Sequence, residues 1–385
     1  MFMQVYVVGG GVAGSAGAIA LRRIGAEVTV VEAYEDPAGP VGSFVSLAAN
    51  GLRCLDLLGC LEPVSRAGFP VPRQRMWSGN GKLLGEVPRG RLADDPRASV
   101  TVRRADLVAA LRAEALRSGA RIATGRRVTE LPVDADLVVG ADGIWSSTRA
   151  FVDPAAPEPR YAGQYSVSGT STGLALPGGS FNMIFARRGA FLHVTAPDGQ
   201  VWWSAQVSVT EEPDPRAVGL AELRAVFATE PQASAILAAA DGPLTRTVHH
   251  VLPPLTTTHQ DRVVLIGDAA HPVGAGQGAS MALEDAVVLG QQLGLAQQHG
   301  GPSFVNDAVI AFDRLRRARI GKMVKMAASN RDAKTAGRFA AGMRDLVLPI
   351  VFPLVYPKAT SWLYTYDPGP ILAGPEVGHR ADAVG

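Results

Sequence analysis

A βαβ pattern at the N-terminus constrains the fold more than any other feature of this chain. Met3–Val8 and Val28–Val31 are short apolar runs, and each predicts a buried strand. Between them, Gly9, Gly11 and Gly14 form a G-x-G-x-x-G motif that opens a helical segment. Two parallel strands joined by a helix predict an α/β fold with a Rossmann-like parallel sheet.

The glycines of this motif suit a bound dinucleotide. Gly9 allows a tight turn, Gly11 admits a pyrophosphate close to the backbone, and Gly14 lets the helix pack on the strand. The first helical residues, Val12 and Ala13, present their free backbone amides to the phosphates at the positive end of the helix dipole. In a chain with 43 glycines the motif alone would be weak evidence, but here strand, turn, helix and strand follow in order.

Glu32 ends the second strand and completes the dinucleotide pattern. Its carboxylate can accept hydrogen bonds from a ribose diol, and such charge-assisted bonds contribute roughly 1.5–3 kcal/mol each. A carboxylate would also repel a 2′-phosphate. We therefore expect that this site does not hold NADP.

A second block, Val263–Ala286, predicts another ligand-binding turn. The run Val263–Ile266 reads as a buried strand, and Asp268 stands at its carboxyl end. A loop with Gly274, Gly276 and Gly278 follows, and then a helix from about residue 280. Glycines let a backbone approach a ligand closely, and the helix adds free amides, so the block suits a polar or anionic group.

Composition places the chain among ordinary globular proteins. Its 385 residues suffice for two domains, 47% are hydrophobic and 19% are charged. A net charge of +2 gives no case for nucleic acid or an acidic membrane as a partner. Cys54 and Cys60 predict buried free thiols, and no cluster has the spacing of a metal site.

The N-terminus and one apolar run indicate where in the cell the protein is expected. The N-terminus enters a strand at once, so we expect no signal peptide and a cytoplasmic protein. The apolar run Leu346–Tyr356 is too short to span a bilayer. Because Pro349 and Pro353 should break it, we expect a helix and a turn that pack on the body.

The nucleotide-binding part is expected to be discontinuous. Its predicted segments are 1–70, 98–155 and 258–335, with a substrate-binding sheet domain at 71–97 and 156–257 and a C-terminal helical segment and tail at 336–385. Period-two patterns predict an antiparallel sheet, with strands at Tyr165–Thr170, Phe181–Phe185, Phe191–Thr195 and Val201–Val207. Further predictions are a hairpin within Met76–Val87, a strand at Arg121–Val128, helical structure at Ala217–Ala239 and a long helix at Ser303–Ala328.

The predicted sheet domain carries aromatic and sulfur-containing side chains that either line a substrate pocket or fill the interior. These residues are Phe181, Met183, Phe185, Phe191, Trp202 and Trp203. Because side chains alternate along a strand, Trp202 and Trp203 point to opposite faces, and at most one of them lines a pocket. His271 is a candidate catalytic base, with a structural role as the alternative.

Three blocks in this order resemble the class A, single-component FAD-dependent monooxygenases, the aromatic hydroxylase family. They are GGGVAG with Glu32, VGADGIWSSTR at Val139–Arg149, and the Gly-Asp block with Asp268. The segment TVRRADLVAAL is also similar to the family, and it places Arg104 where members carry an arginine. The loop from His271 to Gly276 departs from the family, because it is shorter and its proline lies beside the histidine.

The resemblance implies an FAD site with residues from all three blocks. The ADP end of FAD would lie on Gly9–Gly14 and Glu32, and the middle of the cofactor near Arg104 and Asp268. The flavin ring would lie against the loop and helix start that contain Gly276, Gly278 and Ala279. Asp142 and Arg149 would shape the cofactor and NAD(P)H surface.

The implied reaction is hydroxylation of an aromatic or polycyclic small molecule through a flavin C4a-hydroperoxide, with NADPH or NADH as reductant and O2 as co-substrate. Only one G-x-G-x-x-G unit of this kind is present, so no second nucleotide fold is expected for NAD(P)H. Two alternatives stay open: a related flavin oxidoreductase (Baeyer–Villiger enzyme, epoxidase or dehydrogenase), and a flavin-binding protein without turnover. A monomer and a homodimer are both compatible with the sequence.

Overall fold

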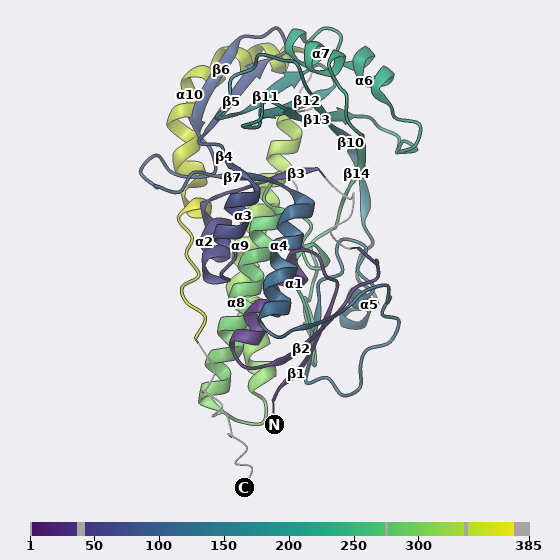
Figure 1. Cartoon of the computed structure of the whole chain (residues 1–385), viewed down its shortest axis with the longest axis vertical. Coiled ribbons are helices and arrows are strands. Elements are labelled where there is room, and N and C mark those ends of the chain that lie inside the picture. The colour runs from purple at the N-terminus through teal and green to yellow at the C-terminus, as the bar shows by residue number, and fades with distance from the viewer. Residues whose placement is uncertain (1, 37–42, 274–275, 335–337, 373–385) are drawn as a thin grey trace.

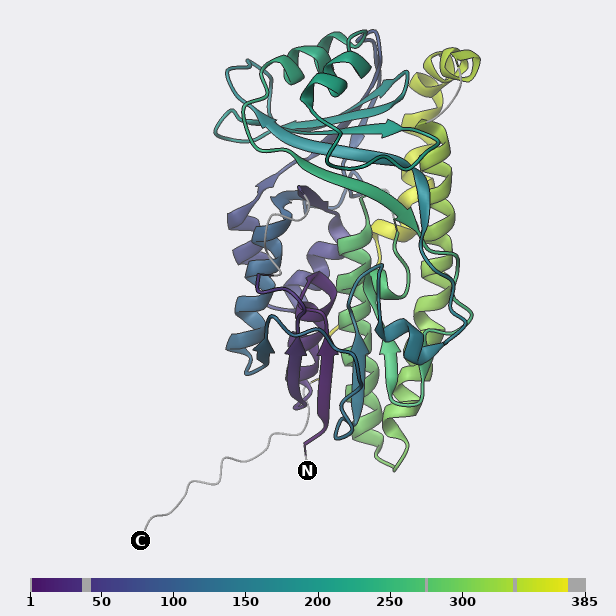
Figure 2. The same cartoon turned by 90° about the vertical axis from the view of Figure 1, so that its right-hand side faces the viewer.

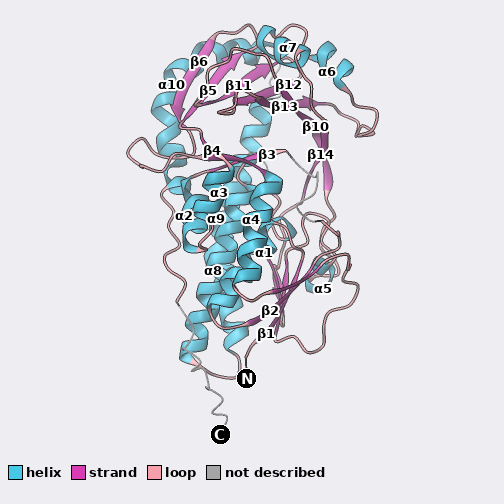
Figure 3. Cartoon of the chain, viewed as in Figure 1, coloured by secondary structure: helices cyan, strands magenta, loops and turns pink. Residues whose placement is uncertain are grey.

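The computed structural model describes residues 2–36, 43–273, 276–334 and 338–372. Two large sheets lie at opposite ends of an elongated molecule, with helices packed between and beside them (Figure 1). The helices and strands alternate in the lower part, whereas strands dominate the upper part (Figure 3).

The lower sheet has six strands in the order β15-β16-β9-β1-β2-β8. Their bounds are β1 Gln4–Val8, β2 Glu27–Val31, β8 Arg121–Ala123, β9 Leu137–Gly140, β15 His259–Gln260 and β16 Val263–Leu265. All neighbours are parallel except β15 and β16, which confirms the predicted α/β fold with a Rossmann-like sheet. The strand predicted at Arg121–Val128 ends early, at Ala123.

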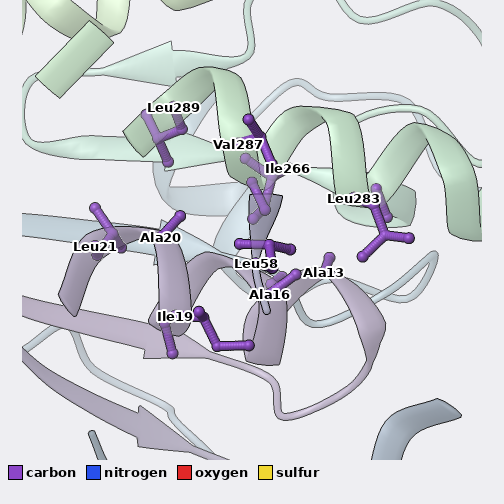
Figure 4. Close-up of a cluster of buried hydrophobic side chains, with 14 of the residues drawn as sticks. Ala13, Ala16, Ile19, Ala20, Leu21, Leu58, Ile266, Leu283, Val287 and Leu289 are labelled. Carbon is purple, nitrogen blue, oxygen red and sulfur yellow. The ribbon is translucent and has the colours of Figure 1, made fainter. Parts of the chain in front are cut away.

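The core beside this sheet joins the two ligand-binding blocks of the sequence. Helix α1 (Val12–Arg23) packs on α8 (Gly278–His299), although they are more than 250 positions apart. Figure 4 shows Ala16 and Ile19 of α1 in one buried cluster with Ile266 and with Leu283 of α8. The contact holds the N-terminal ends of both helices in the same part of the molecule.

Further helices and a small sheet surround this core. The helices are α2 Ala49–Leu57, α3 Leu61–Ala67, α4 Arg104–Arg117, α5 Thr148–Val152 and α9 Phe304–Lys334, with a 3-10 turn at Gly267–Ala269. A three-stranded antiparallel sheet, β3-β7-β4, consists of Phe44–Leu47, Val100–Arg103 and Phe69–Pro70. It lies between the helices and the upper sheet (Figure 1).

The upper sheet has seven strands in the order β14-β10-β13-β12-β11-β5-β6. Their bounds are β5 Arg73–Ser78, β6 Leu83–Pro88, β10 Arg160–Ser171, β11 Ser180–Ala186, β12 Gly189–Thr195, β13 Val201–Ser208 and β14 Thr245–Val251. The predicted strands and the hairpin are confirmed, and the pairing is antiparallel except between β5 and β11.

The two faces of the upper sheet have different roles. Helices α6 (Leu220–Val226) and α7 (Pro231–Ala238) cover its outer face, where one helical stretch was expected (Figure 2). Trp203 and Phe191 are fully buried against these helices, with their rings stacked at a centroid distance of 5.9 Å. Of the two alternatives left open by the sequence, Trp203 and Phe191 therefore take the interior one, because strand alternation turns both into the outer core.

Helix α10 (Arg338–Tyr364) corrects a second expectation. It continues through Pro349, Pro353 and Pro357, although the first two were expected to break it. Proline removes one hydrogen bond to the residue four positions earlier. A spacing of four confines the lost bonds to one side of the helix, and packing of α10 along β6 supports it.

The described part of the chain contains neither a membrane-spanning helix nor a metal-binding cluster. No helix there combines the length and the apolar character needed to cross a membrane. Within the same residues, no group of three or more His, Cys, Asp or Glu side chains has the arrangement of a metal site.

Candidate active site

The first glycine-rich turn has the predicted shape of a phosphate-binding loop. A Cβ on Gly9 would lie 2.4 Å from the Ala141 carbonyl oxygen, and one on Gly14 would lie 1.8 Å from the Gly9 carbonyl oxygen. At Gly11, in contrast, the nearest atom to a Cβ would be Nη2 of Arg104, at 3.9 Å. The first turn of α1, with Val12 and Ala13, contains no acidic residue. The loop is thus closely packed inside and open where a pyrophosphate would approach.

Glu32 lies at the end of β2 beside this loop and is 7% exposed. Its Oε2 accepts a hydrogen bond from the Gly10 amide (2.6 Å), and its Oε1 accepts one from the Tyr34 amide (2.8 Å). The carboxylate therefore fixes the turn and keeps further lone pairs for ribose hydroxyls. Its contact with a ribose stays a prediction.

The Gly-Asp block meets the start of α1. Gly267 has a φ of +59°, and a Cβ there would lie 2.8 Å from Cβ of Ala13. Asp268 Oδ1 lies 3.7 Å from the position of a Cβ on Gly278, at the start of α8. The Asp268 side chain is exposed to solvent on one side and surrounded by protein on the others. This desolvation raises the pKa of Asp268, although the nearby charges of His271 and Arg104 act to lower it.

A buried charge network anchors the block to α8. The side chains of His271 and Asp285 are hydrogen-bonded between Nε2 and Oδ2, at 2.5 Å. The same Oδ2 accepts the Gly267 amide (2.8 Å), and Oδ1 accepts Nε of Arg316 (2.7 Å). Burial alone would raise the pKa of Asp285, but His271 and Arg316 lower it to about 2. These contacts favour the structural role of His271 over that of a base.

The middle block, Val139–Arg149, is tied to the same region. The Asp142 carboxylate accepts bonds from Oγ of Ser146 (2.6 Å) and from the amide of Thr148 (3.0 Å), so it caps α5. Arg149 donates to the carbonyl oxygens of Ala269 (3.0 Å) and Ile144 (2.6 Å). Arg149 thus joins the second block to the third. A direct contact of Asp142 with a cofactor stays a prediction.

Unpaired buried atoms gather around the predicted flavin position. In the described part of this region, four buried atoms have no hydrogen-bond partner: Oδ1 of Asn50, Nδ1 of His271, Oε1 of Gln277 and Oγ of Ser280. A Cβ on Gly51 would lie 2.5 Å from Oγ of Ser280, so α2 and α8 meet here. Buried polar atoms normally have partners. The heteroatoms of a flavin ring would supply them, so the residues present fit FAD.

The start of α8 provides the remaining predicted contacts. Gly276 has a φ of +76° and open space at its Cβ position, and Gly278 and Ala279 begin a helix with no acid in its first turn. Such a helix start favours negative charge. Gly274 and its neighbour at 275, the shortened part of the loop, lie outside the described residues.

The inner face of the upper sheet points toward these blocks. Alternation along β11 places Phe181, Met183 and Phe185 on this face, and Trp202 joins them from β13. Trp202 packs on Phe69 of β4, with ring centroids 5.2 Å apart. The predicted pocket residues other than Phe191 and Trp203 therefore share one face, although their contact with a substrate stays a prediction.

A polar row on the same face was missed in the sequence. Oγ of Ser168 and Oγ of Ser204 are 3.0 Å apart, and Nε2 of His249 lies 2.9 Å from Oγ of Ser166. The signal was present, because polar residues alternate with Tyr165 and Val167 along β10.

Comparison with known proteins shows the family to which the chain belongs. Residues 2–132 and 91–325 match the FAD binding domain family. The chain is 30% identical to the aurachin C monooxygenase/isomerase of Stigmatella aurantiaca, over 76% of this chain and 81% of that protein. The chain belongs to the FAD-dependent aromatic hydroxylases. It is an oxidoreductase of the flavin monooxygenase type.

Two further members extend the likeness over nearly the whole chain. The 3-hydroxybenzoate 6-hydroxylase 1 of Aquipseudomonas alcaligenes is 27% identical, over 94% of this chain and 98% of its own length. The structure of Klebsiella pneumoniae HpxO with FAD and uric acid has a TM-score of 0.78, with 24% identity and coverage of 90% and 92% of the two chains. At that identity the structural likeness shows the hydroxylase fold alone.

Proposed function

We propose that this flavoprotein consumes NADPH or NADH and O2 and hydroxylates an aromatic or polycyclic small molecule. The single observation that carries the proposal is the meeting of Gly11, Arg104, Asp268 and the start of α8 beside unpaired buried atoms. These residues lie far apart in sequence, yet one extended cofactor would contact all of them. When bound, FAD would supply electron transfer from NAD(P)H and the activation of O2.

The chain itself would bind the cofactor, orient the substrate and exclude water. Glu32 would hold the ribose, and Arg104 and Asp268 would hold the middle of the cofactor. Backbone amides at Gly278 and Ala279 would stabilise negative charge on the ring. The inner face of the upper sheet would place an aromatic ring against the flavin and keep water away from the reacting atoms.

Similar proteins support the substrate class. One relative acts on 3-hydroxybenzoate, and HpxO was solved with uric acid, so planar rings are bound within this fold. Met183 and Leu192, partly exposed on the inner face, would pack on such a ring, while Ser168 and Ser204 would meet its polar substituents.

Aerobic oxidation of NADH and NADPH tests the proposal. We expect a panel of phenols and polycyclic ketones to contain compounds that accelerate oxidation and gain one oxygen atom from ¹⁸O2. Product mass and structure separate hydroxylation from Baeyer–Villiger oxygenation, epoxidation and dehydrogenation. Bound flavin that neither nucleotide reduces, with every compound of the panel present, would sink the proposal and leave a flavin-binding protein without turnover.

A further inference from the structure

Arg89 is an arginine in apolar surroundings at the edge of the upper sheet. It follows β6 directly, and its guanidinium lies 3.5 Å from the centroid of the Phe181 ring. Its Nη1 donates a hydrogen bond to Oε1 of Gln74 (2.6 Å). Gln74 and Phe181 are register partners on the inner face, so Arg89 lies on the side of the sheet that faces the flavin loop.

Within the described residues, this guanidinium has no carboxylate partner. Nε is buried without a hydrogen-bond partner, and Gln74 is neutral. Two other arginines of this region are paired with carboxylates: Arg75 lies 2.5 Å from Glu86, and Arg53 lies 2.5 Å from Asp95. The edge formed by Nε and Nη2 of Arg89 thus has the geometry for a bidentate bond to a planar anion.

The surroundings make a bare cation unfavourable there. Burial lowers the pKa of Arg89 to about 10, but the group still carries its charge at neutral pH. Arg89 is only partly exposed, and a desolvated charge without a carboxylate partner is destabilising, so such a group is a candidate for binding rather than for folding. Stacking on Phe181 offsets only part of this cost.

Two tyrosines of α10 complete the cluster. The hydroxyls of Tyr356 and Tyr364 are 2.8 Å apart, and both groups interact electrostatically with Arg89. Burial raises the pKa of both phenols, so they stay neutral and can donate hydrogen bonds. Tyr364 packs in one apolar cluster with Val273 and Met281, which flank the flavin loop.

We propose that Arg89, Tyr356 and Tyr364 bind an anionic oxygen group of the substrate, so that the enzyme selects aromatic acids over their neutral analogues. The proposal rests on the proposed function, because it assumes that the ring of the substrate lies against the flavin. The shared chemistry of the ligand is a negatively charged oxygen, from a carboxylate or from a deprotonated acidic hydroxyl.

Binding to the oxidised, FAD-loaded enzyme tests the inference without turnover. Flavin absorbance is followed during titration with three hydroxybenzoates, the matching hydroxybenzamides, and an acidic hydroxyl compound without a carboxylate, 4-hydroxycoumarin. We expect at least one hydroxybenzoate or 4-hydroxycoumarin to bind with roughly 10-fold or greater preference over neutral amides. A carboxylate ligand and an acidic hydroxyl ligand are distinguished by which of these arms binds.

Variants of Arg89 then locate the effect. Arg89→Met keeps the apolar contact with Phe181 and should weaken the anion by roughly 10- to 100-fold, while neutral amides change by less than about 3-fold. Arg89→Lys keeps the charge without the fork and should fall between the two. Arg73→Met, an exposed arginine on the same hairpin, is the matched control and should bind as the wild type does.

The outcomes separate this inference from the proposed function. Equal binding of acids and amides by the wild type, no binding of any anion, or equal losses of both ligand types in Arg89→Met would overturn the anion site. Hydroxylation of neutral compounds alone would overturn it and leave the monooxygenase intact. Tight anion binding that depends on Arg89, without reduction by NAD(P)H, would uphold the site and reject the monooxygenase.

Discussion

At the scale of single residues, two carboxylates hold the candidate cofactor site from inside the protein. Glu32 accepts the Gly10 amide at the phosphate-binding turn, and Asp285 accepts the Gly267 amide at the flavin end. Each side chain therefore combines a structural bond with a position beside the expected ligand. Replacement of either one is expected to change loop geometry as well as charge.

Replacement of Glu32 by Ala should release FAD. Loss of a charge-assisted bond to the ribose and loss of the Gly10 contact together predict a decrease in FAD affinity of roughly 10- to 100-fold. Flavin absorbance that remains with the protein after gel filtration measures the effect. Glu27→Ala, at the other end of β2 where Glu27 accepts a part-buried hydrogen bond from Gln4, is the control and should keep its flavin. Full occupancy in Glu32→Ala would contradict the ribose assignment.

We expect Asp285 to make a pH-dependent contribution to the free energy of unfolding. Its pKa is about 2 in the folded protein against a usual 3.8, so the contribution is present above pH 4 and is lost as the pH falls through 2. The difference in free energy of unfolding between wild type and Asp285→Asn should be about 1 kcal/mol smaller at pH 3 than at pH 5. Urea denaturation at both pH values measures it.

A control for this experiment lies on α9. Asp313 pairs with the half-exposed Arg317 at 2.9 Å, so Asp313→Asn should cost less than about 1 kcal/mol at pH 5. Asp285→Asn should cost about 3–5 kcal/mol there, because it leaves Arg316 buried with an incomplete set of partners. Equal losses of unfolding free energy in the two variants would show that the buried network stabilises the protein no more than a surface pair does.

At the scale of elements, the close packing of α1 on β1 requires glycine at position 14. It does not require glycine at position 17, one helical turn later. A Cβ on Gly14 would lie 1.8 Å from a backbone oxygen, whereas one on Gly17 would lie 3.4 Å from Cδ1 of Ile266. We expect Gly14→Ala to unfold the turn and lower stability by more than about 3 kcal/mol. Gly17→Ala should be neutral or stabilising by up to about 1 kcal/mol, since alanine favours a helix. Thermal unfolding of both variants compares them, and equal effects would reject the packing argument.

Local patterns predicted most of these elements, and non-local ones escaped. The alternation of β10 to β13 and the G-x-G-x-x-G turn are readable within one segment, and the structure confirms both. The parallel pairing of β5 with β11 joins segments about a hundred residues apart, so no local pattern reports it. Helix α10 was mispredicted because proline propensity is local, whereas its support from β6 is tertiary.

The same division holds for the candidate site. Motifs identified Gly11, Glu32 and Asp268, because phosphate and ribose binding need particular residues at fixed spacing. Arg89 and Tyr364 escaped, since neither belongs to a motif and their meeting depends on α10 packing beside the sheet. Sequence therefore indicated the cofactor far better than the substrate.

At the scale of the whole molecule, FAD would connect segments that the chain itself joins only over long distances. Bound cofactor would contact the start of α1, the start of α4 and the start of α8 together. At a free FAD concentration of 100 times Kd, linkage predicts about 2.7 kcal/mol of stabilisation, or a rise in Tm of roughly 3 °C for a chain of 385 residues. Melting of apoprotein with increasing FAD measures it. Glu32→Ala should need more FAD for the same rise, and a Tm that stays constant with FAD would contradict the assignment of the site.

The strand order of the lower sheet also determines when its apolar surface is covered during synthesis. β1 and β2 pair early, but β9 and β16, which complete the apolar centre of the sheet, come at residues 137–140 and 263–265. At about 5–20 residues per second, synthesis from β2 to β16 takes roughly 10–50 s. Throughout that interval the first βαβ unit has uncovered apolar surface, because α8, its main packing partner, has not been made. The burial of the N-terminal βαβ unit is thus completed only during synthesis of the last third of the chain.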